Sequence, residues 1–169
     1  MNEKKILRSN LDEIKGIKKL SIENIKIINN FIKNKTVCTY IHTDSEIAIT
    51  NDLSGYKKLI TTYLVSSGIK LCLYEGPFIK NALNILEPEN PKKVNKVDVF
   101  LVPGIAFTTS GKRLGRGGWY YDKLLSIYPE TLKIGITFNE RIIDDIPTES
   151  HDISMDYVFT NDKYYKSEI

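Results

Sequence analysis

The alternation of apolar and polar positions divides the chain into helical and extended segments. Apolar residues recur at helical spacing over residues 3–15, with Ile6, Leu11 and Ile14 along one face. A second helix is predicted after Ser21, because serine is a favourable N-cap residue and isoleucines recur at helical spacing beyond it. The N-terminal part of the chain is therefore expected to be helical.

The rest of the chain shows apolar runs that alternate with helical patterns. Strands are predicted over 36–42, 69–74, 97–103, 132–138 and 155–160, helices over 54–68 and 119–128, and a loop over 82–93. The run at 97–103 is apolar throughout, which is typical of a strand buried on both faces. We therefore predict an α/β fold: a single-domain, three-layer sandwich over residues 1–169, with a mainly parallel sheet and helices on both faces.

The composition is that of an ordinary globular protein, with 41% hydrophobic and 27% charged residues. A net charge of +3 is too small to indicate nucleic acid or a membrane surface as the partner. No apolar run approaches the length of a membrane span and no secretory leader is visible, so we expect a cytoplasmic monomer. Cys38 and Cys72 lie in apolar runs and are expected to be buried, unpaired thiols, with a disulfide or shared metal as the alternative.

One segment, SGKRLGRGGWYYDKL at 110–124, concentrates glycine, basic and aromatic residues. Five of the ten glycines lie within 104–118, and two of the four arginines are Arg113 and Arg116. The segment links a predicted buried strand to a predicted helix, which is where ligands bind in open α/β sheets. Glycines let main-chain N–H groups approach an anion, a helix N-terminus attracts negative charge, and Lys112 and the arginines add positive charge. We therefore predict a polyphosphate-binding cradle.

Two familiar phosphate-binding patterns do not fit this cradle. A Walker A loop has four residues between its glycines and Ser or Thr after its lysine. Here six residues separate Gly104 from Gly111, and Arg113 follows the lysine. A dinucleotide fingerprint that begins at Gly115 has Tyr120 in place of its last glycine. The cradle is therefore expected to be of another kind.

Two acidic residues are candidate ligands for a metal that accompanies the phosphates. Asp122 follows the cradle in the first turn of the predicted helix, and Asp152 lies in the loop before the last predicted strand. Magnesium typically takes one or two carboxylates together with phosphate oxygens. Compensation of the helix dipole is an equally good explanation for Asp122. His151 is interpreted as a surface or hydrogen-bonded loop residue.

The sequence resembles the 5-formyltetrahydrofolate cyclo-ligase family, also called methenyltetrahydrofolate synthetase, in five motifs that occur in the same order. The motifs are Lys4 and Arg8 of K-x-x-x-R, SEIAIT at 45–50 with Glu46, ILEP at 85–88, VPGIAFTTSGKRLGRGGWYYDKLL at 102–125, and IPTESHDISMDYVFT at 146–160. The resemblance implies ATP- and Mg²⁺-dependent cyclisation of 5-formyltetrahydrofolate to 5,10-methenyltetrahydrofolate, with release of ADP and phosphate. It implies a phosphorylated formyl intermediate and an α/β sandwich.

Matched position by position, the resemblance also implies a role for each motif residue. ATP would be bound by Lys4, Arg8, Arg113, Leu114, Gly115, Arg116, Gly117, Gly118, Trp119, Tyr120 and Tyr121, with Arg116, Tyr120 and Tyr121 in catalysis. Glu46 would bind the pterin ring of the folate together with Tyr120. Asp122 and Asp152 would hold Mg²⁺.

The chain departs from the family pattern at several places. Trp119 replaces the last glycine of the glycine motif, and Thr108 and Arg141 stand where the family usually has Asp and Gln. The segment 75–84 is about half the usual length, which shortens the expected cover of the folate pocket. A diverged, non-catalytic homologue that binds a nucleotide or folate is therefore the alternative. A small RNA-binding module built on RGGWYY is a third, weaker interpretation.

Overall fold

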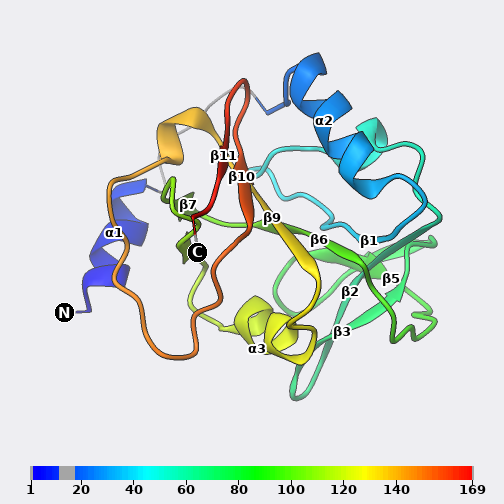
Figure 1. The fold of residues 1–169 in the computed structure, drawn as a ribbon. Helices are drawn as coiled ribbons and strands as arrows, with labels where there is room; N and C mark the ends of the chain where they lie inside the picture. The colour runs from blue at the N-terminus through cyan, green and yellow to red at the C-terminus, as the bar shows by residue number, and fades with distance from the viewer. Residues whose placement is uncertain (1, 12–17, 169) are drawn as a thin grey trace.

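The computed structural model describes residues 2–11 and 18–168 and is built around a seven-stranded sheet (Figure 1). The strands of this sheet are β1 (Thr36–Cys38), β2 (Lys58–Val65), β3 (Gly68–Leu73), β6 (Val99–Pro103), β9 (Leu132–Ile136), β10 (Tyr157–Phe159) and β11 (Tyr164–Lys166). Their order is β11-β10-β9-β6-β1-β2-β3. The pairs from β10 to β2 are parallel, and the edge strands β11 and β3 are antiparallel to their neighbours. The predicted mainly parallel α/β sheet is confirmed.

Helices cover both faces of the sheet. The helices are α1 (Glu3–Leu11), α2 (Ile22–Ile32) and α3 (Tyr120–Ile127), and Figure 1 shows α2 and α3 on opposite sides. Strand β6 alternates between the two layers: Leu101 belongs to the core that contains Ile28 of α2, and Phe100 to the core that contains Leu124 of α3. Both faces of β6 are therefore buried, as its uniformly apolar sequence predicts. Among the described residues, no helix combines the length and apolar character needed to cross a bilayer.

Two small hairpins and two 3₁₀ turns complete the described structure. One hairpin joins β4 (Phe78–Lys80) to β5 (Leu86–Pro88), and the other joins β7 (Ala106–Phe107) to β8 (Arg113–Leu114). The 3₁₀ turns are Thr50–Asp52 and Asn139–Arg141. We call residues 77–89, which contain β4 and β5, the arm.

The helix predicted over 54–68 is wrong, because most of this segment forms strand β2. Ile60, Thr61, Thr62 and Tyr63 are β-branched or aromatic, and such residues lose side-chain freedom in a helix and pack well in a sheet. Gly68, expected to end the helix, has φ of 143° and pairs with Val65 across a two-residue turn to β3. The apolar periodicity therefore belongs to a hairpin.

Other boundaries also differ from the prediction. The predicted loop 82–93 contains β5, which pairs with β4, and β11 follows the strand that was expected to be the last. Strand β1 ends at Cys38, short of the predicted 36–42, because the chain then turns over the carboxyl end of the sheet. Helix α1 confirms the first prediction as far as Leu11, whereas Ile14 lies outside the described residues.

The second helix and the cysteines agree with the sequence analysis. Ser21 caps α2, and its side-chain oxygen accepts a hydrogen bond from the Asn24 N–H at 3.1 Å. Cys38 and Cys72 are buried free thiols. Burial raises the pKa of both thiols, that of Cys72 to about 12, so they remain protonated at neutral pH.

Candidate active site

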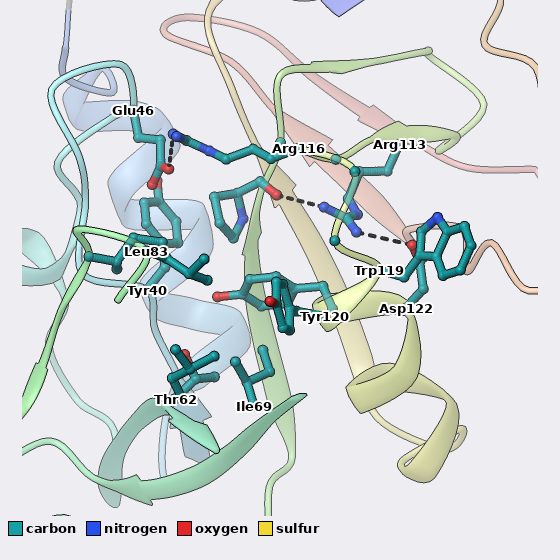
Figure 2. A pocket seen from close by; sticks show the side chains of 18 of the residues that line it. Tyr40, Glu46, Thr62, Ile69, Leu83, Arg113, Arg116, Trp119, Tyr120 and Asp122 are labelled. Carbon is teal, nitrogen blue, oxygen red and sulfur yellow. Dashed lines mark hydrogen bonds and ion pairs between the residues drawn. The ribbon is translucent and has the colours of Figure 1, made fainter. Parts of the chain in front are cut away.

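A cavity of about 390 Å³ opens beyond the carboxyl ends of the central strands β1 and β6 (Figure 2). Tyr40 follows β1 and Gly104 follows β6, so the cavity lies where open α/β sheets bind ligands. The residues to which the family resemblance gives a role all line it: Lys4, Arg8, Glu46, Arg113, Leu114, Gly115, Arg116, Gly117, Gly118, Trp119, Tyr120, Tyr121, Asp122 and Asp152. The structure therefore brings together residues from both ends of the sequence.

One end of the cavity is built around the buried side chain of Arg113. Its guanidinium donates to the carbonyl of Pro103 at 3.2 Å and lies 3.4 Å from the Asp122 carboxylate. Burial lowers the pKa of Arg113, while Asp122 opposes that shift. Arg8 of α1 reaches the same end and donates from Nε to the Gly115 carbonyl at 2.7 Å. Two guanidinium groups thus flank the glycine-rich loop.

Helix α1 contributes a second ion pair at this end. The ammonium group of Lys4 is buried and lies 2.5 Å from the Asp152 carboxylate, and it is 3.7 Å from Glu149. Partial burial raises the pKa of Asp152. Hydrogen bonds from Lys4 and from the Glu149 N–H, together with the charge of Lys4, lower this pKa by a larger amount. The net pKa lies below the ordinary value of 3.8. Asp152 is therefore ionised throughout the neutral range.

The loop between β8 and α3 presents main-chain N–H groups to the cavity. Within the described part of the chain, the N–H groups of residues 115–122 donate no hydrogen bond, whereas that of Lys123 bonds to the Trp119 carbonyl. The free N–H groups include those of the first turn of α3, which have no partner within the helix. Gly117 has φ of 103°, which favours glycine. These donors and the nearby cations form an anion-binding surface.

Trp119 occupies an unfavourable backbone conformation at the start of α3. Its φ of 58° lies in the left-handed region, which costs a bulky residue on the order of 1 kcal/mol or more. The indole nevertheless leaves the cavity open, because it turns outward against His151 with ring centroids 4.9 Å apart.

Two other residues of this segment lie outside the cavity. Lys112 was expected to add positive charge to the cradle, but its ammonium group pairs with Asp145 at 2.6 Å and does not line the cavity. Thr108 is buried, and its hydroxyl accepts the N–H of Lys112 at 3.1 Å and contacts Ser110 at 2.8 Å. Thr108 therefore stabilises the turn between β7 and β8, as an aspartate there could.

The other end of the cavity is less polar and carries one carboxylate. Glu46 lies in the loop after β1, and its carboxylate is 2.6 Å from the Arg116 guanidinium. The same guanidinium nitrogen is 2.9 Å from the hydroxyls of Thr43 and Ser45. Figure 2 shows Arg116 extending across the cavity from the glycine-rich loop toward Glu46. Arg116 therefore connects the two ends.

The apolar wall at this end was not identified from the sequence. It is formed by the β2–β3 hairpin and the arm, through Thr62, Tyr63, Leu64, Ile69, Leu83, Ile85 and Leu86. Thr62 could not be assigned to a site while 54–68 was predicted to be a helix. The exposed leucines of the arm could have identified this wall from the sequence, because the short 75–84 segment was expected to cover the folate pocket.

Tyr121 is suited by its burial to donate a hydrogen bond and not to act as a base. Burial, followed by the nearby Glu46 carboxylate, raises its pKa well above the ordinary value, although Arg113 opposes the shift. The Arg113 guanidinium lies 5.6 Å from the centre of its ring. The phenol therefore stays neutral at physiological pH and keeps its proton.

The carboxylates at the cationic end fit a magnesium ion that is bound jointly by the protein and by phosphate oxygens. They fit a site made of protein side chains alone less well. Within residues 2–11 and 18–168, no group of three or more His, Cys, Asp or Glu side chains could hold a metal ion. Asp122 and Asp152 both line the cavity. Asp122 accepts the Ile153 N–H at 3.1 Å through one oxygen and lies 3.4 Å from Arg113 through the other. Magnesium commonly uses one or two carboxylates and completes its shell with phosphates and water.

Comparison with known proteins identifies the family. A model of the 5-formyltetrahydrofolate cyclo-ligase family matches residues 2–161. The 5-formyltetrahydrofolate cyclo-ligase of Mycolicibacterium smegmatis is 32% identical over 145 residues, which cover 76% of this chain and 75% of that one.

Solved structures agree in fold. The 5,10-methenyltetrahydrofolate synthetase of Aquifex aeolicus aligns with a TM-score of 0.77 and 27% identity, over 96% of this chain and 90% of that one. The Mycoplasma pneumoniae 5,10-methenyltetrahydrofolate synthetase aligns with a TM-score of 0.68 and 21% identity, over 96% of this chain and all of that one. The predicted fold class and the predicted enzyme family are both confirmed. The chain belongs to the 5-formyltetrahydrofolate cyclo-ligase family.

Proposed function

We propose that this chain uses ATP and Mg²⁺ to convert 5-formyltetrahydrofolate to 5,10-methenyltetrahydrofolate, with release of ADP and phosphate. One observation carries the proposal: a single cavity has cations and free N–H donors at one end and an apolar wall with a carboxylate at the other. The first end suits a triphosphate, and the second suits a flat heterocycle with an N–H edge. Family membership supports the same reaction.

The cationic end is proposed to hold the nucleotide. The N–H groups of residues 115–121 and the side chains of Lys4, Arg8 and Arg113 would bind the phosphates of ATP. Gly115, Gly117 and Gly118 keep side chains off this surface; a Cβ at Gly117, for example, would lie 3.4 Å from the Arg8 guanidinium. Leu114, buried in β8, anchors the start of the loop.

The metal site is proposed to form when the triphosphate binds. Asp122 and Asp152 would supply the protein ligands, and the ion would neutralise phosphate charge during the transfer. Both carboxylates already face cationic groups, Arg113 beside Asp122 and Lys4 beside Asp152, which hold them in place.

The less polar end is proposed to hold the folate. The Glu46 carboxylate would accept hydrogen bonds from the N–H edge of the pterin ring, and Tyr120 would lie between folate and phosphates. Arg116 would leave Glu46 to meet the transferring phosphoryl group, since its backbone lies in the glycine-rich loop and its side chain extends across the cavity to Glu46. Tyr121, which keeps its proton, would donate to a developing negative charge.

Two steps then complete the reaction. The formyl oxygen attacks the γ-phosphorus and ADP leaves, which converts a poor leaving group into a phosphate ester. The neighbouring folate nitrogen attacks the formyl carbon, the ring closes and phosphate leaves. The protein contributes positioning and stabilisation of charge on the phosphoryl oxygens. All the predicted site residues lie on one chain, which supports a monomer as the catalytic unit.

The direct test is the near-ultraviolet absorbance of methenyltetrahydrofolate, measured with the protein, ATP, Mg²⁺ and 5-formyltetrahydrofolate. We expect the absorbance to rise at a rate proportional to protein concentration and to stay flat without ATP. No rise at any protein concentration, while calorimetry still detects ATP or folate binding, would leave the non-catalytic homologue as the function. No heat with ATP and Mg²⁺ would remove the nucleotide site itself.

A further inference from the structure

The side chain of Trp119 is exposed in a place where the fold gives it no structural task. The indole is 51% exposed, and the residue adopts φ of 58° at the N-cap position of α3 without making a side-chain capping bond. A strained, exposed aromatic residue beside a ligand cavity is a reason to look for a function, because strain of this kind clusters at functional sites.

The contacts of the indole place it at the cationic end of the cavity. Its ring lies 4.9 Å from the His151 ring at an interplanar angle of 57°. His151 in turn lies 3.6 Å from the Asp152 carboxylate, which pairs with Lys4. Figure 2 shows Trp119 beside Asp122, on the side of the cavity away from Glu46. The ring therefore lies next to the proposed phosphate site and away from the proposed folate site.

Three of the other aromatic residues of the cavity are engaged or buried, and the fourth, Tyr120, is partly buried and is proposed above to lie between folate and phosphates. Tyr40 is buried and its hydroxyl donates to the Ile47 carbonyl at 2.7 Å. Tyr63 is buried in β2, and the ring of Tyr121 lies against the Arg113 guanidinium. Among the aromatic residues lining the cavity, Trp119 is the most open to solvent on the phosphate side.

We propose that the exposed face of the Trp119 indole stacks on the base of the nucleotide whose phosphates occupy the cradle. This inference rests on the proposed nucleotide site and adds a positioning residue for the base. Every base has a π-face, so stacking on an indole gives affinity with little selection among bases. His151, against the ring, limits its rotation and holds it ready for the base.

The ring can report its own occupancy, because Trp119 is the only tryptophan of the chain. We expect ATP to change the intrinsic fluorescence saturably, with GTP producing a similar change. Tripolyphosphate should compete with ATP in calorimetry but leave the fluorescence near its starting value, since it carries no base.

Two variants separate stacking from an effect on the loop. Trp119→Leu removes the aromatic face and keeps a similar backbone cost, whereas Trp119→Phe keeps an aromatic ring. We expect Trp119→Leu to weaken ATP binding about tenfold and to leave tripolyphosphate affinity unchanged, with Trp119→Phe in between.

The possible outcomes test the stacking proposal separately from the proposed function. Equal ATP affinity in Trp119→Leu and the native protein would overturn the stacking proposal and leave the nucleotide site intact. An equal loss for ATP and tripolyphosphate would also overturn it, because the ring would then act only through the loop. If the native protein binds neither probe, the nucleotide site and the stacking proposal both fail.

Discussion

At the scale of single residues, Arg116 is the group on which turnover is expected to depend most. Arg116→Ala should lower kcat more than tenfold, because removing a cation that meets the transferring phosphoryl group raises the barrier by several kcal/mol. Lys112→Ala is the matched control: Lys112 lies in the turn just before β8, close to Arg116 in the sequence, but pairs with Asp145 outside the cavity. Steady-state kinetics should show near-native kcat for the control. An unchanged kcat in Arg116→Ala would place the phosphoryl group elsewhere.

Lys4 and Asp152 allow a prediction about pH. The folded-state pKa of Asp152 is depressed, so its interaction with Lys4 stabilises the fold above pH 3.8 and is lost as the pH falls through the folded pKa. Lys4→Met removes the hydrogen bond and charge that lower this pKa and leaves the burial that raises it. We expect the Asp152 pKa to rise in the variant.

The carboxyl carbon of Asp152, followed by NMR over an acid titration, measures this shift. Lys92→Met is the control, since Lys92 forms an exposed pair with Glu75, remote from Asp152 in the chain and outside the cavity. Superimposable titrations of Lys4→Met and the native protein would show that Lys4 does not hold this carboxylate ionised.

At the scale of elements, the sequence predicts what local chemistry determines and misses what pairing determines. Helix α2 follows from its cap at Ser21, and β6 follows from its uniform burial. Strand β2 could not be predicted in the same way, because its residues at 58–65 also satisfy a helical spacing. Only pairing with the antiparallel strand β3 distinguishes a strand from a helix here. The arm is extended for the same reason, since β4 and β5 are three residues each and stabilise one another.

The candidate site shows the same division. The residues of the glycine-rich loop and its acids were predicted together, because short motifs specify them. The apolar wall was not predicted, because Leu83 and Ile69 reach the cavity only through the packing of the arm and the β2–β3 hairpin. The resemblance to the family suggested the roles, while geometry corrected the place of Lys112, which lies outside the cavity.

The arm is expected to act as the folate-side wall because a single carboxylate fastens it to the sheet. Glu87 accepts the Leu64 N–H of β2 at 2.7 Å and the Asn81 side-chain amide at 3.0 Å. Glu87→Ala removes both bonds and leaves a partly buried donor unpaired, which typically costs about 1 kcal/mol. We expect the KM for 5-formyltetrahydrofolate to rise several-fold while the KM for ATP stays near the native value.

Glu75→Ala is the control for the arm, because Glu75 lies just before it and its carboxylate, among the described residues, pairs with the exposed Lys92 alone. Kinetics with each substrate varied in turn separates the two effects. An equal rise in both KM values for Glu87→Ala would mean that the whole cavity loosens and that the arm has no particular role toward folate.

At the scale of the whole molecule, one aromatic ring connects the sheet to the phosphate-binding loop. Phe107 of β7 is fully buried, and the ring fits because its neighbours on two strands have no side chain. A Cβ at Gly135 of β9 would lie 2.5 Å from this ring, and one at Gly104, just after β6, would lie 2.8 Å from it. The β7–β8 hairpin carries Arg113 in β8 and leads directly into the loop that carries Arg116. The position of the cradle therefore depends on how closely Phe107 approaches the sheet.

This dependence predicts coupled losses of stability and ATP binding. Gly135→Ala should push the Phe107 ring outward, destabilise the fold by about 1–3 kcal/mol, and weaken ATP binding because the hairpin moves with the ring. Thermal unfolding should show a Tm lower by several degrees, and calorimetry a raised Kd for ATP. Phe107→Leu removes ring atoms that the new methyl group would meet, so the double variant should lose less than the sum of the single variants. Strictly additive losses would mean that the sheet and the cradle are not coupled through this ring.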